Sequence, residues 1–214
     1  MFKVTTITHL TDDTTRPLIC LTTRKGFKYL FGKVPEGTQR VVNTFGSEVK
    51  FSKLQGIFLT GSILSWSDIG GLPGFFLTVS DATKNGLTVM GCERILSYIL
   101  ATWRQFVFRM GIKLHILDAE TNPTIVDEEV VISPIMIDPA NQTSPPENSS
   151  KLVRQIKKLA SLMFPLDTNP TQNDIHTHVH LPSASEIATT QQSISYCISF
   201  VPVLGKFDPK KAKE

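Results

Sequence analysis

Short runs of apolar residues separated by polar turns predict β-strands along much of the chain. Residues 17–22 and 27–31 form two such runs on either side of Arg24, Lys25 and Gly26. Glycine adopts positive φ at little cost, so this spacing predicts a β-hairpin. Further strands are expected over residues 1–7, 56–60, 86–90, 130–132 and 193–201.

A second pattern, with apolar residues three or four positions apart, predicts helices between these strands. A short helix is expected over residues 38–45, ending at Gly46. Ser67 or Asp68 can cap a second helix through residue 79, with Pro73 tolerated only near its first turn. The clearest helix covers residues 93–110, and its apolar stripe is expected to face the core.

The alternation of strands and helices predicts an α/β fold in which helices cover the faces of a sheet. Periodicity alone leaves open whether this is a doubly wound sheet or a two-sheet sandwich.

The composition changes after about residue 117, where Pro, Asn, Thr and Ser become frequent. A solvated linker over 139–150 leads into an amphipathic basic helix over 151–164. We therefore expect a domain over 1–132, a protruding flexible arm over 133–192, and a return strand with the start of a helix over 193–214. That last helix breaks off early, so we expect the sequence to be a truncated piece of a longer chain.

The composition narrows the function classes. A chain of 214 residues with 41% hydrophobic residues can bury a core, and its net charge of +3 permits RNA binding without indicating it. The chain has neither a run of about 18 apolar residues nor a recognisable leader, and its three cysteines lack CxxC spacing. We expect an intracellular protein without a disulfide framework and with neither a membrane nor DNA as a partner.

The residues that could carry chemistry do not form a recognisable active site. His176, His178 and His180 alternate as zinc ligands on a strand can, but they lie in the polar arm and lack the H-x-H-x-D-H pattern of a dinuclear hydrolase. The turn Glu36-Gly37-Thr38-Gln39-Arg40 could meet a phosphate, although a purely structural turn is equally compatible with it.

The arm helix carries four cations on one flank. They are Lys151, Arg154, Lys157 and Lys158. Such a flank can neutralise RNA phosphates without sequence preference, although many charge runs are only solvated faces.

Three segments, taken in order, resemble the tRNase Z family. Residues 29–40 are similar to the family's strand and turn ending in E-G-T-Q. Residues 57–60 and 68–74 are similar to its F-L-T-H-x-H-x-D-H and G-L-P-G segment. Residues 205–214 are similar to the strand-to-helix entry that follows the family's arm.

The metal motif departs from the family pattern. Its four ligand positions fall on Ile63, Ser65, Ser67 and Asp68. An apolar side chain cannot ligate zinc, serine is a poor neutral ligand, and one carboxylate cannot hold a zinc pair. We expect no catalytic residue and no bound metal in this chain.

The resemblance is to the amino half of a long-form tRNase Z, the endonuclease that removes the 3′ trailer from precursor tRNA. It implies a four-layer αβ/βα metallo-β-lactamase-like sandwich and a carboxy-terminal half whose zinc ions perform the cleavage. This chain would support that half and hold precursor tRNA through its arm.

Two alternatives remain open at this level. One is a purely structural partner that does not touch RNA, and the other is an independent metallohydrolase. A nuclear location is favoured, with the mitochondrion as the alternative.

Overall fold

A computed structural model describes residues 1–8, 16–46, 49–63, 66–82, 86–92, 114–121, 124–138 and 192–202. Within these residues the chain forms two sheets. The larger sheet, called sheet A here, has six strands in sequence order. They are β1 (Lys3–Thr8), β2 (Leu18–Thr22), β3 (Lys28–Gly32), β4 (Leu54–Leu59), β5 (Leu87–Gly91) and β6 (Leu114–Asp118).

Sheet A changes from antiparallel to parallel at β3. Strands β1, β2 and β3 pair antiparallel, whereas β3, β4, β5 and β6 pair parallel. The hairpin predicted around residues 24–26 is confirmed, with Gly26 at a φ of 85°. Because a parallel pair needs a crossover connection, a helix lies between β3 and β4 and another between β4 and β5.

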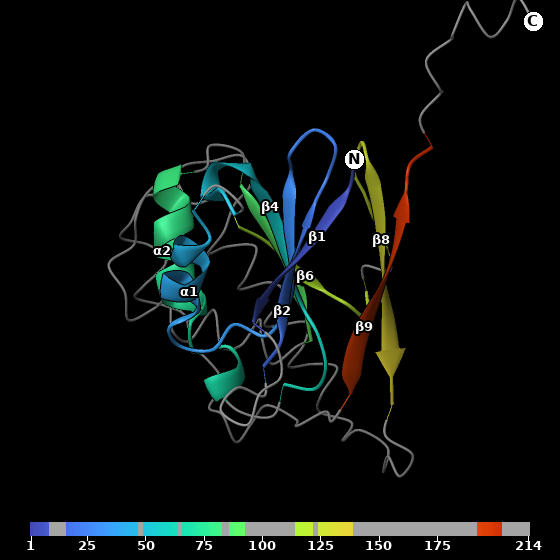
Figure 1. The fold of residues 1–214 in the computed structure, drawn as a ribbon. Helices are drawn as coiled ribbons and strands as arrows, with labels where there is room; N and C mark the ends of the chain where they lie inside the picture. Colours follow the sequence, from blue (N-terminus) through green and yellow to red (C-terminus); the bar gives the residue numbers. More distant parts are fainter. Residues whose placement is uncertain are drawn as a thin grey trace, which may run out of the picture.

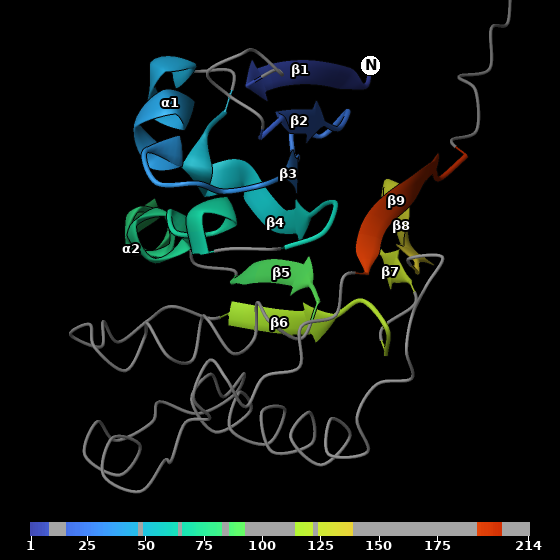
Figure 2. The same ribbon diagram turned by 90° about the horizontal axis from the view of Figure 1, so that it is seen from below.

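Two α-helices cover one face of sheet A (Figures 1 and 2). Helix α1 (Thr38–Thr44) joins β3 to β4, and α2 (Leu72–Ala82) joins β4 to β5. Short 3₁₀ turns precede β4 and α2 at η2 (Phe51–Lys53) and η3 (Trp66–Asp68). Fully buried side chains from α2 and β4 fill the space between these layers, among them Phe75, Phe76 and Ile57.

The start of α2 corrects one prediction. Neither Ser67 nor Asp68 caps α2, because both belong to η3 and the helix begins four residues after Asp68 at Leu72. Pro73 lies in the first turn of α2, where its missing N–H costs no hydrogen bond.

A second, three-stranded sheet, called sheet B here, faces the other side of sheet A (Figure 2). It consists of β7 (Ile125–Val126), β8 (Val130–Ile137) and β9 (Ser193–Phe200). Strands β8 and β9 pair antiparallel along their whole length, from Val130 with Phe200 to Ile137 with Ser193. Strand β8 thus continues beyond residue 132, where the predicted amino-half domain ends; the division into domain and arm stays a prediction.

Hydrogen bonds and an ion pair connect the two sheets. The Tyr196 hydroxyl of β9 lies 3.1 Å from the carbonyl oxygen of Leu59 and 3.3 Å from that of Met90, within reach to donate to either. At the hairpin end, the buried Glu129 carboxylate accepts a hydrogen bond from the Lys25 N–H at 2.9 Å. Arg24 lies 3.7 Å from the same carboxylate.

The pKa of the Glu129 carboxyl reflects these contacts. Burial raises it, but hydrogen bonds from Thr23 and from the Lys25 backbone, together with the charges of Arg24 and Lys25, bring the pKa below its ordinary value. The carboxylate is therefore the favoured form in the folded protein.

Several predictions concern residues outside the described part. They are the helix over 93–110, most of the arm, and the helix beginning near 209. Among the helices that the structure describes, none has the length and hydrophobicity needed to cross a bilayer.

Candidate functional site

The carboxyl ends of β3 and β4 bring the two main motifs of the sequence together. In parallel α/β sheets this edge is where ligands bind, because the loops after the strands converge there. Residues 34–39 follow β3, and residues 63–74 follow β4. The Val34 N–H donates to the carbonyl of Asp68 at 2.9 Å, and the Gly71 N–H donates to that of Val34 at 3.0 Å.

Gly71 is required by this contact. A Cβ atom on it would lie only 2.1 Å from the carbonyl oxygen of Pro35, a distance no side chain can occupy. The glycine therefore permits the two loops to touch through their backbones.

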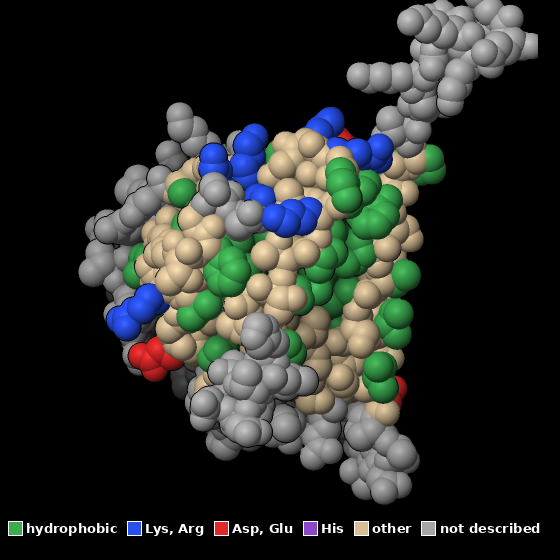
Figure 3. Space-filling view, in the orientation of Figure 1, with side chains coloured by type: hydrophobic (Ala, Val, Ile, Leu, Met, Phe, Trp, Pro, Cys, Tyr) green, Lys and Arg blue, Asp and Glu red, His purple; other side chains and the backbone are tan. Residues whose placement is uncertain are grey.

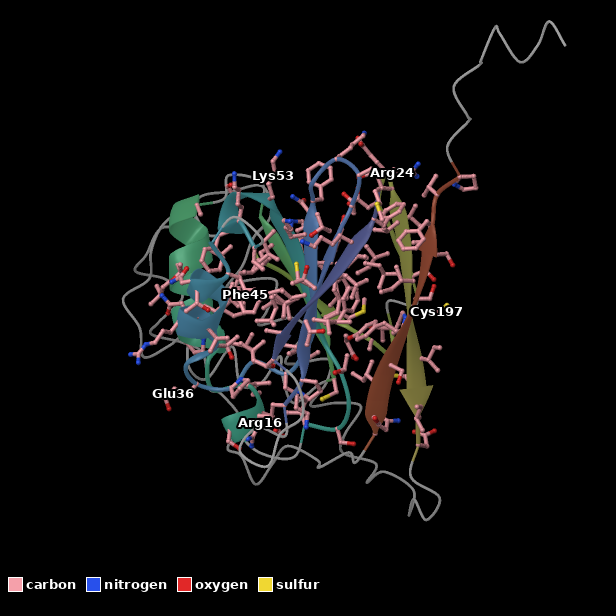
Figure 4. All side chains as sticks on the ribbon, viewed as in Figure 1. Arg16, Arg24, Glu36, Phe45, Lys53 and Cys197 are labelled. Carbon is pink, nitrogen blue, oxygen red and sulfur yellow. The ribbon has the colours of Figure 1, made fainter. Side chains whose placement is uncertain are left out.

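The turn over Glu36, Gly37, Thr38 and Gln39 has a structural role in this geometry. Gly37 takes a φ of 85°, and the buried Thr38 hydroxyl donates to the carbonyl of Pro35 at 2.6 Å. The Gln39 side chain reaches toward Gly74 of α2, since a Cβ there would lie 3.3 Å from its Oε1. The exposed Glu36 side chain points away from the molecule (Figure 4).

The degenerate metal positions divide between the core and the loop surface. Ile63 is 3% exposed and belongs to the hydrophobic core, whereas Ser67 is exposed. Asp68 is 5% exposed. Ser65 lies outside the described residues.

Two cations converge on the Asp68 carboxylate. Arg16, from the segment before β2, contacts its Oδ1 through Nε at 2.9 Å, and Lys33, just after β3, contacts the same oxygen through Nζ at 3.4 Å. Arg16 Nη2 also donates to the Ser67 hydroxyl at 2.7 Å. Figure 4 shows Arg16 beside η3 at this end of the molecule. The side chains are 31% exposed for Arg16, 20% for Lys33 and 7% for Asp68.

This donor set does not fit the zinc pair that the family motif would hold. Ile63 offers no lone pair, and the one carboxylate is already neutralised by a guanidinium and an ammonium group. Within the described residues no group of three His, Cys, Asp or Glu side chains could share a metal ion. The positive charge at this site is supplied by Arg16 and Lys33.

Sequence reasoning did not identify Arg16 and Lys33. Arg16 lies 52 residues before Asp68, and no motif spacing connects the two. Only the pairing of β2 with β3 and of β3 with β4 brings these segments to the same edge.

The other candidate residues fall outside the described part of the chain. They are the arm cations Lys151, Arg154, Lys157 and Lys158 and the histidines His176, His178 and His180. Their proposed roles stay predictions.

Comparison with known proteins identifies similar chains. Residues 5–71 match the family model described as tRNase Z endonuclease. The chain is 37% identical over 219 aligned positions to Ribonuclease Z of Saccharomyces cerevisiae, covering 99% of this chain and 25% of that protein. It is 22% identical to Ribonuclease Z 1 of Schizosaccharomyces pombe, covering 87% of this chain and 31% of that protein.

A solved structure agrees with these sequence matches. The crystal structure of a long-form RNase Z from yeast superposes with a TM-score of 0.71 at 36% identity, covering 95% of this chain and 27% of that one. The predicted α/β fold class and the resemblance to the amino half are confirmed by this match. The chain spans about a quarter to a third of the length of these relatives.

Proposed function

Because the chain is homologous to the amino-terminal part of long-form ribonuclease Z, we propose that it is the non-catalytic half of an endonuclease that removes the 3′ trailer from precursor tRNA. In this proposal the half supports a carboxy-terminal catalytic half of the same polypeptide. It also contributes to holding the tRNA.

One observation carries the non-catalytic part of the proposal. At the positions of the family's metal ligands the chain has a core residue, Ile63, and a carboxylate, Asp68, bound by Arg16 and Lys33. A guanidinium in place of a metal cannot supply an activated water, because it has no exchangeable coordination position. The zinc of the full-length enzyme is therefore assigned to the carboxy-terminal half.

The tRNA-holding part of the proposal relies on charge. The arm cations Lys151, Arg154, Lys157 and Lys158 would contact phosphates, and such contacts depend on backbone shape and salt more than on sequence. We also propose a nuclear location, with the mitochondrion as the alternative, and localisation of a fluorescently tagged full-length protein would distinguish the two.

The first test measures cleavage of precursor tRNA and zinc content in the full-length protein. Asp68→Asn and Ser67→Ala are expected to leave kcat and the zinc-to-protein ratio unchanged, because neither residue would touch metal or substrate. Loss of zinc or of kcat in a correctly folded variant would show that this half is catalytic.

The second test replaces the four arm cations with alanine. We expect KM for precursor tRNA to rise at least about tenfold with kcat unchanged, and the salt dependence of binding to become shallower. A control variant removes three exposed cations from the described domain, Lys3, Lys50 and Lys53. Equal KM values for wild type, arm variant and control would instead favour a purely structural half.

A further inference from the structure

One end of sheet A is rich in lysine and arginine. At this end β1 and β4 begin and the β2–β3 hairpin turns, so it lies opposite the edge that carries the candidate site. In Figure 3 Lys and Arg side chains gather along this end, with few Asp or Glu side chains among them on the face shown. Figure 4 labels Lys53 and Arg24 there.

The cations of the hairpin turn are already neutralised. Lys25 forms an ion pair with Glu128, and Arg24 lies 3.7 Å from the buried Glu129 carboxylate. The positive charge that lacks a carboxylate partner therefore belongs to the neighbouring lysines.

Lys28, the first residue of β3, is buried without an anionic partner. Phe31 of the same strand contacts Tyr196 of sheet B, so Lys28, three positions earlier, faces the helices. Lys28 is 8% exposed, and its ammonium donates to the Thr22 hydroxyl at 2.8 Å. Among the described residues no carboxylate forms an ion pair with it. A buried charge is normally paired, because the loss of hydration is costly.

Two exposed lysines border Lys28 from the segment before β4. The parallel register pairs Lys28 with the first residue of β4, which follows Lys53 directly. The Lys53 N–H donates to the Lys50 carbonyl at 3.0 Å, so a single 3₁₀ turn, η2, separates these two residues. Phe51 of η2 contacts Phe75 of α2 at a ring-centroid distance of 5.3 Å, which places the turn on the same, helix-covered face as Lys28.

Lys28, Lys50 and Lys53 are called the lysine cluster here. The Lys53 ammonium lies 5.6 Å from the centroid of the Phe27 ring, and Phe27 immediately precedes Lys28. In the part of the chain that the structure describes, no carboxylate pairs with Lys50 or Lys53. Three ammonium groups that repel one another gain free energy from a shared anion, and lysine binds phosphate as a point charge.

The burial of Lys28 favours a small phosphate compound over the backbone of RNA. A terminal phosphate group carries about −1.5 to −2 charges at neutral pH, whereas a backbone phosphodiester carries a single charge and is flanked by two riboses. With Lys28 only 8% exposed, a compact terminal group can reach its ammonium more closely than an internal phosphodiester.

We propose that the lysine cluster binds the diphosphate group of a small ligand, either free pyrophosphate or an organic diphosphate ester. The Thr22 hydroxyl orients the Lys28 ammonium, and Lys50 and Lys53 contact the same group from η2. This site is separate from the arm and from Asp68. It goes beyond the proposed function and does not depend on it, because binding is measured without RNA.

Acetylation of the full-length protein, read for each lysine by mass spectrometry, tests the site with inorganic pyrophosphate at constant ionic strength. A bound anion favours the unreactive ammonium form, so Lys50 and Lys53 should react at least about threefold more slowly. Lys25, whose partner is Glu128, should react at an unchanged rate. Reading each lysine separately keeps pyrophosphate bound elsewhere in the protein from affecting the result.

Two outcomes of this experiment would overturn the proposal. One is an unchanged acetylation rate at Lys50 and Lys53. The other is an equal slowing at Lys25, which would indicate an adventitious ion only.

Adenosine diphosphate in place of pyrophosphate identifies the source of the diphosphate group. Equal protection of Lys50 and Lys53 by the two compounds would support an ester, and protection by pyrophosphate alone would support the free anion. Protection by precursor tRNA but by neither compound would overturn the assignment to a small ligand.

Lys28→Met removes the ammonium and keeps an unbranched side chain. It should raise the Kd for pyrophosphate, obtained from the acetylation of Lys53, at least about tenfold. The β3 amides should exchange hydrogen no faster than in wild type, because a buried ammonium without an anion contributes little stability. Faster exchange with an unchanged Kd would assign Lys28 a purely structural role and refute the proposal.

The control variant combines Lys25→Met with Glu128→Gln. It removes an ammonium group from the same end of sheet A together with its carboxylate partner. Its Kd for pyrophosphate should stay within about twofold of wild type, because an exposed, neutralised pair exerts little force on a nearby anion. An equal loss of affinity in this control and in Lys28→Met would contradict a specific site at Lys28.

Discussion

Replacing Arg16 tests the claim that cations stabilise the degenerate site. In Arg16→Met the Asp68 carboxylate keeps Lys33 at 3.4 Å but loses the guanidinium contact at 2.9 Å, and Ser67 loses its donor. A hydrogen bond to a charged group contributes about 1.5–3 kcal/mol, and an exposed ion pair about 0–1 kcal/mol. With Arg16 31% exposed and Asp68 nearly buried, we expect a loss of about 1–2 kcal/mol.

Native-state hydrogen exchange of the full-length protein measures this loss of stability at the amides of sheet A. The core amides of β4 should exchange roughly 5–30 times faster in Arg16→Met than in wild type. Arg40→Met is the matched control, since it removes an exposed arginine from α1. Combining Arg16→Met with Asp68→Asn completes a double-mutant cycle whose coupling energy should be about 1 kcal/mol.

Two results would refute the reasoning. If Arg16→Met exchanges no faster than Arg40→Met, the ion pair contributes nothing to the loop. If the two single substitutions are additive, the stabilisation does not come from the contact between Arg16 and Asp68.

Three further predictions follow from the fold, and each is checked by the free energy of unfolding or by local amide hydrogen exchange. Gly71→Ala should destabilise the protein by more than about 2 kcal/mol, because a Cβ meets the Pro35 carbonyl; an unchanged midpoint in urea would exclude that clash. Because the pKa of Glu129 is lowered in the folded state, its carboxylate contributes its full stabilisation when the pH is above the ordinary pKa of 4.5. This stabilisation is lost as the pH falls through the folded-state pKa. In Glu129→Gln the free energy of unfolding should therefore fall less steeply as the pH is lowered than it does in the wild type. The same acid dependence in both proteins would contradict the stabilising role of the Glu129 carboxylate. Tyr196→Phe removes a hydroxyl that lies within reach of two main-chain carbonyls, and it should lower the free energy of unfolding by about 1 kcal/mol. Unchanged hydrogen exchange of the β9 amides would contradict this prediction.

The elements of the fold that the sequence predicts are those defined by the spacing of nearby residues. The hairpin around Gly26, the helix ending before Gly46 and the strand over 56–60 all follow from short-range spacing, and the structure contains each within about two residues. Strand β6 was not predicted, because residues 114–118 mix His and Asp with only three apolar positions.

For the candidate site, the sequence predicts the missing metal ligands but not the residues that surround Asp68. Family spacing located Ile63 and Asp68 at the ligand positions, but the partners of Asp68 come from segments whose meeting depends on strand order. The capping role expected of Asp68 was wrong because Asp68 lies in η3, four residues before α2 begins, and its carboxylate is held by Arg16 and Lys33 instead.

The β8–β9 ladder has a consequence for how freely the intervening sequence can change. Eight residue pairs, from Val130 with Phe200 to Ile137 with Ser193, fix both ends of the connection over residues 138–192. Closure entropy grows only logarithmically with the length of a flexible loop, so doubling that length costs about 0.6 kcal/mol. We therefore predict that insertions and deletions between the two strands change the free energy of unfolding little, so that selection on the predicted arm can set its length by what the arm must reach.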